Sequence, residues 1–166
     1  MLNQTIDPTQ LAAAISAHLN EDIPASQVKR AIKRYDMSFM PGWRTQSHTF
    51  TAVSVLSGTK TINLDGGYGY FFNAIAGVHV AAAIDTDVFL QSIQINSGNN
   101  FVPDPLPFAL LTRFTGKPLE FCFYAPPNTA LQTEFKNGAT TAAVTLYLTY
   151  FGYKLPAGTI EKIKSA

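Results

Sequence analysis

The side chains best suited to chemistry, three histidines and one cysteine, are widely spaced along the chain. His18 falls in an expected helix, His48 just ahead of an expected strand, and His79 in a strand rich in Gly and Ala. Neither His-x-His nor His-Glu-x-x-His occurs, so the usual spacing of a zinc site is missing. We therefore interpret all three histidines as hydrogen-bonded structural or surface residues.

The thiol and the carboxylates give no catalytic pattern either. Cys122 stands between two phenylalanines with no cation close in sequence, which predicts a small, buried, protonated side chain. A single cysteine cannot form an intrachain disulfide or a cysteine zinc site. Asp85 and Asp87 form Asp-Thr-Asp, which is more typical of a turn than of the paired carboxylates of a glycosidase. The sequence predicts no enzyme, no cofactor and no metal.

Composition points to a surface made for contact with protein. The 166 residues suit one domain, and apolar residues make up 46% of them while charged residues make up only 14%. Ordinary domains carry roughly 25% charged residues, so much of this surface must be neutral. The net charge of +1 argues against nucleic acid or membrane as the main partner. No run approaches ~18 apolar residues and no signal-peptide pattern opens the chain, which predicts a soluble protein.

Residues 1–43 differ in character from the rest and predict a helical arm followed by a linker. Asp7 before Pro8 has the pattern of a helix start, and apolar residues then recur at four-residue spacing to Leu19. A second helix is expected after Pro24, with apolar residues inward and a basic face outward. Residues 37–43 should be irregular, because Pro41 and the glycine after it oppose a helix.

From residue 44 onward the hydrophobic period becomes two. Strands are expected at 49–56, 59–64, 68–84 with a bulge or bend at Gly77, 88–95, 106–114, 119–124, 129–135 and 141–153. Eight such strands without intervening helices predict an all-β, antiparallel β-sandwich over residues 44–155, with jelly-roll topology preferred. Pro126-Pro127 should end one strand and direct the chain across to the other sheet. Residues 156–166 should be a C-terminal tail, with a short basic stretch from Thr159 to Ala166 that is expected to form one or two helical turns.

Two groups of residues are candidate partner sites. The first is the basic face of the second helix, and it comprises Lys29, Arg30, Lys33 and Arg34. It could meet phosphate in a helix-turn-helix, or it could be a solvated face or one that contacts an acidic protein. We favour the second interpretation, because no third helix completes the module.

The second group is the set of large apolar residues in the linker: Met37, Phe39, Met40 and Trp43. Apolar residues without periodicity either plug the end of the sandwich or dock on another subunit. Both interpretations stay open, although interface centres favour Trp and Met.

The C-terminal half has a recognisable order of strands and turns. It runs through Phe101-Val-Pro-Asp-Pro-Leu-Pro-Phe108, then Leu119-Glu-Phe-Cys-Phe-Tyr-Ala-Pro-Pro-Asn-Thr129, Leu131-Gln-Thr-Glu-Phe135 and Val144-Thr-Leu-Tyr-Leu-Thr-Tyr-Phe-Gly-Tyr-Lys154. Over residues 87–155 this order resembles jelly-roll structural proteins of bacteriophage virions, especially capsid decoration or cement proteins. The resemblance implies no catalytic residues. It implies a homo-oligomer, often a trimer, seated on a major capsid protein or other virion proteins.

We therefore expect a non-enzymatic virion structural protein, made in the host cytoplasm, that binds and stabilises a phage capsid. Its N-terminal segment would reach to a neighbouring subunit. Two alternatives remain open. One is a carbohydrate- or receptor-binding module of a phage fibre, in which Tyr68, Tyr70 or Trp43 stacks on sugars. The other is a nucleic-acid-associated virion protein that acts through the basic helix.

Overall fold

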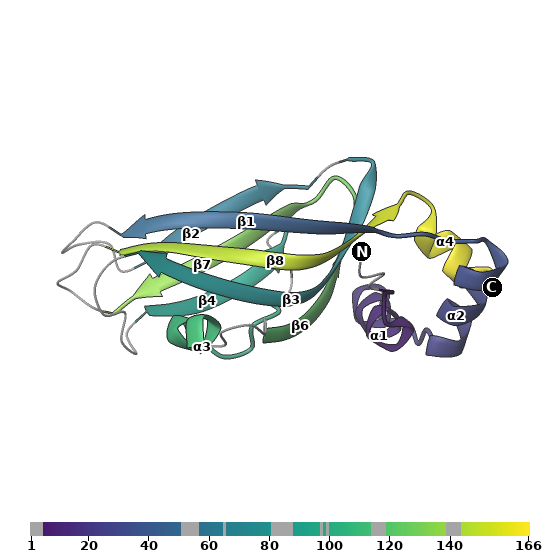
Figure 1. Cartoon of the computed structure of the whole chain (residues 1–166), viewed down its shortest axis with the longest axis horizontal. Coiled ribbons are helices and arrows are strands. Elements are labelled where there is room, and N and C mark those ends of the chain that lie inside the picture. Colours follow the sequence, from purple (N-terminus) through teal and green to yellow (C-terminus); the bar gives the residue numbers. More distant parts are fainter. Residues whose placement is uncertain are drawn as a thin grey trace.

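The computed structural model of the chain describes residues 5–50, 57–64, 66–80, 88–96, 98, 100–113, 119–138 and 144–166. These residues form two antiparallel four-stranded sheets and four short helices (Figure 1). The strands are β1 Met40–Phe50, β2 Ser57–Asn63, β3 Tyr68–Val80, β4 Val88–Ile95, β5 Leu106–Pro107, β6 Leu119–Ala125, β7 Ala130–Asn137 and β8 Val144–Pro156. The helices are α1 Pro8–Leu19, α2 Ala25–Arg34, α3 Phe108–Arg113 and α4 Thr159–Lys164.

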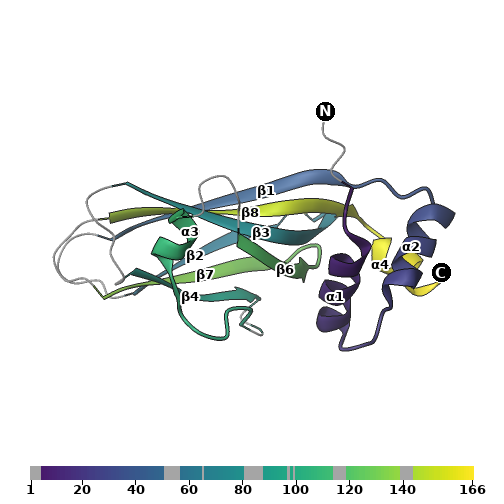
Figure 2. The ribbon, with the colours of Figure 1, turned by 60° about the horizontal axis from the view of Figure 1, so that its bottom comes forward.

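The strands are divided between the sheets in a nested order. Sheet A has the order β1-β8-β3-β6 and sheet B the order β2-β7-β4-β5, and Figure 2 shows them as two layers. The chain crosses from one sheet to the other at every connection except that between β4 and β5. The turn at Pro126-Pro127 links β6 of sheet A to β7 of sheet B, which confirms the predicted crossover. The prediction of a mostly β, antiparallel protein is also confirmed.

The main core lies between the two sheets. One cluster of buried residues takes Phe72 and Tyr150 from sheet A together with Leu90 and Phe135 from sheet B. Along β8, Val144 and every second residue up to Tyr150 are at most 4% exposed, as the alternation of the sequence predicts. Because both sheets contribute to one buried cluster, each covers the inner face of the other.

A second buried cluster joins the helices to the outer surface of sheet A. Leu11 and Ile15 of α1 pack with Phe71, Tyr124 and Tyr153, which point outward from sheet A. The side chain of Asp7 caps α1 by accepting a hydrogen bond of 2.8 Å from the amide of Thr9, as predicted. Helices α1, α2 and α4 therefore gather at one end of the molecule (Figures 1 and 2). The N-terminal segment packs on its own chain.

The predicted bend at Gly77 is wrong. Strand β3 continues through this residue, and its irregularity lies instead at Asn73, between the paired residues Phe72 and Ala74. Gly77 lies beneath α3, where an added Cβ would be 2.7 Å from the ring of Phe108. The glycine is there because the helix approaches the strand closely, not because the strand bends.

The predicted strand over residues 106–114 is also wrong for most of its length. Only Leu106 and Pro107 pair with β4, and Phe108–Arg113 forms helix α3. Phe108 and Leu111 are buried at helical spacing while Leu110, between them, is 39% exposed. A short, mainly apolar run is compatible with either a strand or a helix. The helix forms here because it places both buried side chains in the core.

One further boundary differs from the predictions. Strand β1 begins at Met40, so the linker predicted to be irregular up to Trp43 is partly strand. Pro41 is tolerated because β1 is the edge strand of sheet A and pairs only with β8. The predicted tail helix is confirmed as α4. Residues 51–56, 81–84, 114 and 141–143 of the predicted strands lie outside the described residues.

Replacement of Gly152 by alanine tests the close approach of β8 to β3. An added Cβ would be 1.9 Å from the carbonyl oxygen of Phe71, a backbone atom that cannot rotate away. We expect Gly152→Ala to lower the free energy of unfolding by about 1–3 kcal/mol in urea titrations. Gly67→Ala is the matched control, since an added Cβ there meets nothing within 4 Å, and it should change stability by less than about 1 kcal/mol. Equal stability of the two variants would contradict the close packing.

Candidate interaction surfaces

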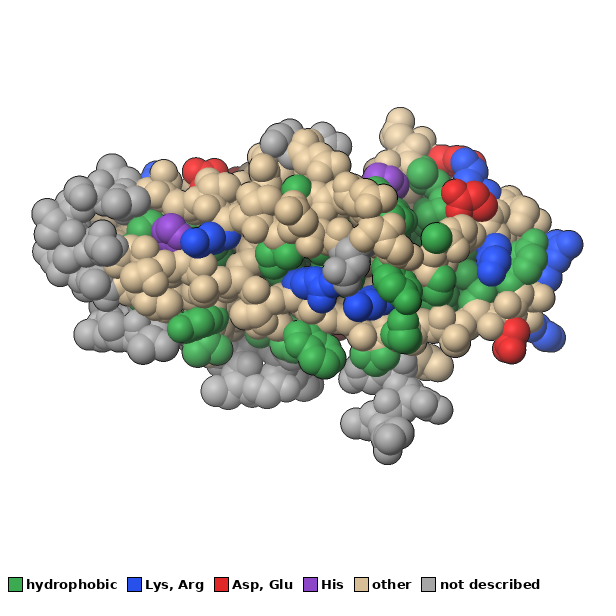
Figure 3. Space-filling view, turned by 90° about the horizontal axis from the view of Figure 1, so that it is seen from above, with side chains coloured by type: hydrophobic (Ala, Val, Ile, Leu, Met, Phe, Trp, Pro, Cys, Tyr) green, Lys and Arg blue, Asp and Glu red, His purple; other side chains and the backbone are tan. Residues whose placement is uncertain are grey.

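The four basic residues of α2 lie on one exposed surface, as predicted. Lys29, Arg30, Lys33 and Arg34 are exposed, while Val28 on the opposite side of the helix is fully buried. Among the described residues, no carboxylate lies within ion-pair distance of Lys29, Arg30 or Lys33. These three cations are therefore exposed with no carboxylate partner in the part of the chain that the structure describes, and Lys and Arg side chains are visible at the helical end in Figure 3.

A third helix does pack on the basic helix, and it comes from the other end of the chain. Gln27 donates hydrogen bonds of 2.9 Å and 3.2 Å to the carbonyl oxygens of Ile163 and Lys164 in α4. Tyr35 and Ser165 share a hydroxyl–hydroxyl bond of 2.9 Å. The tail helix was predicted, but its packing on the basic helix was not, because contacts across more than a hundred residues leave no local pattern. Helix α4 also adds two exposed cations, Lys162 and Lys164.

The apolar residues of the predicted linker separate into two pairs. Met37 and Phe39 are partly buried and pack against the helical cluster, so they serve as a plug at the end of the sandwich. Met40 and Trp43 are 51% and 64% exposed. The first interpretation, a plug at the end of the sandwich, therefore applies to Met37 and Phe39, whereas docking through Met40 and Trp43 stays a prediction.

The outer surface of sheet A beyond the helices is open to solvent, and we call it the open face. Its outward side chains, assigned by alternation along β1, β3 and β8, are Trp43, Thr45, Ser47, Thr49, Ala74, Ala76, Val78, Thr145, Tyr147, Thr149 and Phe151. Large hydrophobic side chains project along the lower margin of Figure 3, where this surface is seen in profile. Of this set, only Trp43 was among the residues that the sequence predicted to contact a partner.

The open face combines exposed apolar groups with paired hydroxyls. Val78, Tyr147 and Phe151 are 61%, 39% and 37% exposed, and Phe151 is the cross-strand partner of Trp43. Hydroxyl pairs link β1 to β8, for example Thr45 to Thr149 at 3.0 Å. None of the described outward residues is charged, and Glu120 on β6 borders the face beside Ala74. Such a surface is suited to contact with another surface that requires no ion pairing.

Of the aromatics proposed to stack on sugars, Tyr70 is not available. It is fully buried, accepts a hydrogen bond from Arg44 and lies 4.8 Å from the guanidinium carbon of that residue. Tyr68 is partly buried, with the ammonium group of Lys154 lying 5.3 Å from the centre of its ring. Trp43 alone of the three offers a widely exposed ring.

The histidines and the cysteine are not brought together into a site. The ring of His18 lies at the surface of α1, 5.1 Å from that of Tyr124, and burial lowers its pKa. The predicted burial of Cys122 is wrong, because the alternation of β6 turns its thiol outward. Partial burial, followed by the charges of Glu120 and Asp7, raises the pKa of this thiol. The side chain of His79, and Asp85 and Asp87, lie outside the described residues.

The prediction that His48 lies just ahead of a strand is wrong. The residue lies within strand β1. Its ring is 4.5 Å from that of Phe50 and 6.0 Å from that of Phe135 on the opposite sheet. Both ring nitrogens are buried and have no hydrogen-bond partner among the described residues. Burial lowers the pKa of His48, and the charge of Lys60 on β2 lowers it further. This imidazole is therefore held in its neutral form between the sheets.

Within the described part of the chain, no three His, Cys, Asp or Glu side chains are close enough to hold a metal ion. None of the described helices has the length and apolar character that a bilayer crossing requires. Comparison of the chain with protein-family models, with curated proteins and with solved structures gives no match. The basic helix and the open face are therefore the candidate functional surfaces of the chain.

Acid should destabilise the fold through His48. The unfolded chain binds a proton near the ordinary pKa of 6.5, whereas the folded chain resists protonation until a lower pH. The free energy of unfolding should therefore fall as pH drops below 6.5, with a slope of at most about 1.4 kcal/mol per pH unit from this residue.

Urea titrations between pH 8 and roughly pH 5, above the range in which most carboxylates titrate, measure this slope. His48→Phe keeps a ring and removes both nitrogens, so its stability should vary less with pH. His18→Gln is the matched control and should retain the part of the slope that His48 contributes. A slope unchanged in His48→Phe would show that the imidazole is not the acid-sensitive group.

Proposed function

We propose that the two sheets form a jelly roll. The strands pair as nested partners, first with last: β1 with β8, β2 with β7, β3 with β6 and β4 with β5. This is the arrangement obtained when one long antiparallel hairpin wraps around a core. Jelly rolls occur in viral capsid and lectin domains, so this topology is compatible with both a virion protein and a sugar-binding module.

We further propose that the chain is a non-enzymatic virion structural protein that attaches to an assembled phage capsid as a decoration or cement protein. The observation that supports this most directly is the open face. It exposes Trp43, Tyr147 and Phe151 together, with no charged group among the described outward residues. Trp and Tyr are the residue types that most often dominate binding energy at protein interfaces.

The physical role would be to bury apolar area across the boundaries between capsid subunits. A specific interface needs about 1,600 Å² of total buried surface, shared between the partners. Docking a neutral face leaves no unpaired charge behind, so desolvation costs little. The partner would be the major capsid protein or another virion protein. The chain would act as a homo-oligomer, with a trimer preferred, and would be made in the host cytoplasm before it joins the virion.

A carbohydrate-binding module is the second candidate, and the exposed ring of Trp43 is the observation that favours it. An aromatic ring can cover the apolar face of a sugar, although a sugar site also needs converging polar groups. A glycan array distinguishes the two proposals. The capsid-binding proposal expects no glycan to bind in a manner that depends on Trp43.

Substitution on the open face tests the proposed attachment. We expect Trp43→Ser to weaken binding to shells that lack the protein by at least about tenfold, because a central tryptophan typically contributes about 2 kcal/mol. Sedimentation of shells with the added chain measures the bound fraction. Thr59→Ser, an exposed change on β2 of sheet B, is the control and should bind normally.

Two results would contradict the proposal. One is the absence of the chain from purified particles of the virus that encodes it, as measured by quantitative mass spectrometry. The other is equal binding to shells by Trp43→Ser and Thr59→Ser when both variants have the stability of the original chain.

A further inference from the structure

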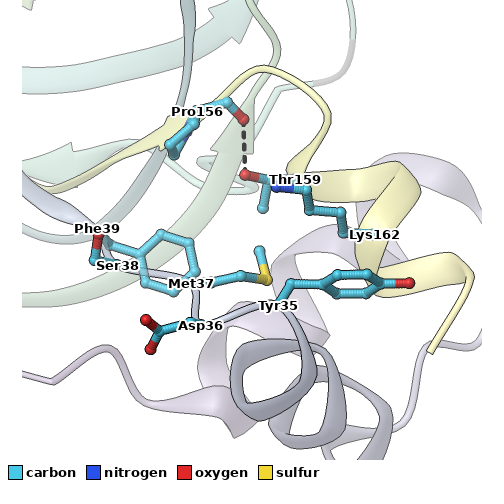
Figure 4. A pocket seen from close by; sticks show the side chains of 8 residues that line it. All are labelled: Tyr35, Asp36, Met37, Ser38, Phe39, Pro156, Thr159 and Lys162. Atoms are coloured by element: carbon cyan, nitrogen blue, oxygen red, sulfur yellow. Dashed lines mark hydrogen bonds between the residues drawn. The ribbon is translucent and has the colours of Figure 1, made fainter.

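A small cavity lies where the helices meet the sandwich, away from the open face. It has a volume of about 190 Å³ and opens between the segment that follows α2 and the junction of β8 with α4 (Figure 4). Its lining residues are Tyr35, Asp36, Met37, Ser38, Phe39, Pro156, Thr159 and Lys162. We call it the junction pocket.

The walls of the junction pocket are mixed, and their apolar part can receive one apolar side chain. Met37, Phe39 and Pro156 supply carbon and sulfur surface, and Figure 4 shows Met37 and Phe39 between the two segments. The hydroxyl of Thr159 donates to the carbonyl oxygen of Pro156 at 2.7 Å, so its proton is already engaged. Small-molecule sites usually measure about 300–1,000 Å³, so this pocket is too small for a cofactor. Methionine walls adapt readily to different side chains.

The rim of the pocket is positively charged on the side of the helices. Lys162 lines the pocket, and its ammonium group is 5.9 Å from the centre of the Tyr35 ring. The basic helix α2 ends immediately before Tyr35, which places Lys33 and Arg34 next in the chain to the pocket lining. Arg34 lies over the Tyr35 ring at 5.4 Å. Cations from two helices, Arg34 and Lys162, therefore border one side of the partly apolar pocket.

We propose that the junction pocket and the basic helix together dock a segment of a partner protein that carries an apolar side chain next to carboxylates. The apolar side chain would fill the pocket, and the carboxylates would meet Lys162, Lys33 and the other cations of α2. We expect carboxylates beside the apolar side chain of the partner segment because of charge complementarity. Lys29, Arg30 and Lys33 have no carboxylate partner among the described residues. This surface is separate from the open face and gives the chain a second partner.

A protein segment fits this surface better than nucleic acid does. Asp36 lines the pocket itself, and Glu161 is next to Lys162 in α4. Glu21 already pairs with Lys164 at 2.6 Å. A continuous run of phosphates would meet these carboxylates as well as the cations, whereas a protein segment can place its few charges selectively.

The probe is a library of random peptides displayed on phage and selected on the full-length chain. Selected peptides should share a Leu, Ile, Met or Phe within one helical turn of Asp or Glu. Their affinity, measured by titration calorimetry, should fall as salt is raised from ~0.1 M toward ~1 M. Lys162→Glu should weaken binding by about tenfold or more, and Lys136→Glu, an exposed change on β7, should not.

A second variant tests whether peptide binding requires the cavity itself, independently of the charge of Lys162. Ser38 is exposed at the pocket, so Ser38→Phe should block the cavity while leaving the folded core unchanged. Loss of peptide binding in Ser38→Phe, together with an unchanged unfolding curve, supports the proposal. The proposal is overturned if no shared motif is selected, or if the selected peptides bind Ser38→Phe normally. It is also overturned if a DNA oligonucleotide binds in place of a peptide and that binding is lost in Lys162→Glu but kept in Ser38→Phe. None of these results depends on capsid attachment through the open face.

Discussion

The structure depends on a layer of aromatic rings held between the two sheets. Tyr150 of β8 lies 5.5 Å from Phe72 and 6.1 Å from Phe123 in its own sheet, measured between ring centres, and its hydroxyl bonds to Thr133 of sheet B. Burial raises the pKa of Tyr150, so this hydroxyl stays neutral and keeps its partner. Aromatic pairs of this kind contribute about 0.5–1.5 kcal/mol beyond the area they bury. Each sheet buries one face in this layer. The outer faces of the sheets are therefore left for contact with the helices or with a partner.

Strand β8 connects that core to both candidate surfaces. Its inward residues, such as Tyr150, belong to the aromatic layer, and its outward residues meet two different environments along the strand. Tyr153 and Leu155 are covered by the helices, whereas Tyr147 and Phe151 remain on the open face. The packing of α1 therefore decides where the open face ends. A change that loosened the helices would expose more of the same surface rather than create a new one.

The two proposed docking surfaces differ in chemistry as well as in place. The open face is neutral among its described residues, so binding there would depend on buried area and respond weakly to salt. The junction pocket combines a small, partly apolar cavity with cations from α2 and α4, so binding there would weaken as salt is raised. A chain that used both surfaces could join two different neighbours.

Local patterns in the sequence determined the elements whose signals lie within one segment. The alternation before Tyr150, the cap at Asp7 and the crossover at Pro126-Pro127 are all as expected, because period and turn chemistry act between near neighbours. The identity of Phe108–Arg113 as a helix was decided by the tertiary structure, which offered two buried positions at helical spacing. The tertiary structure also covered Met37 and Phe39 but not Trp43, and it placed α4 beside α2. Burial depends on which remote segment packs on a face, and the residues of that face carry no record of it.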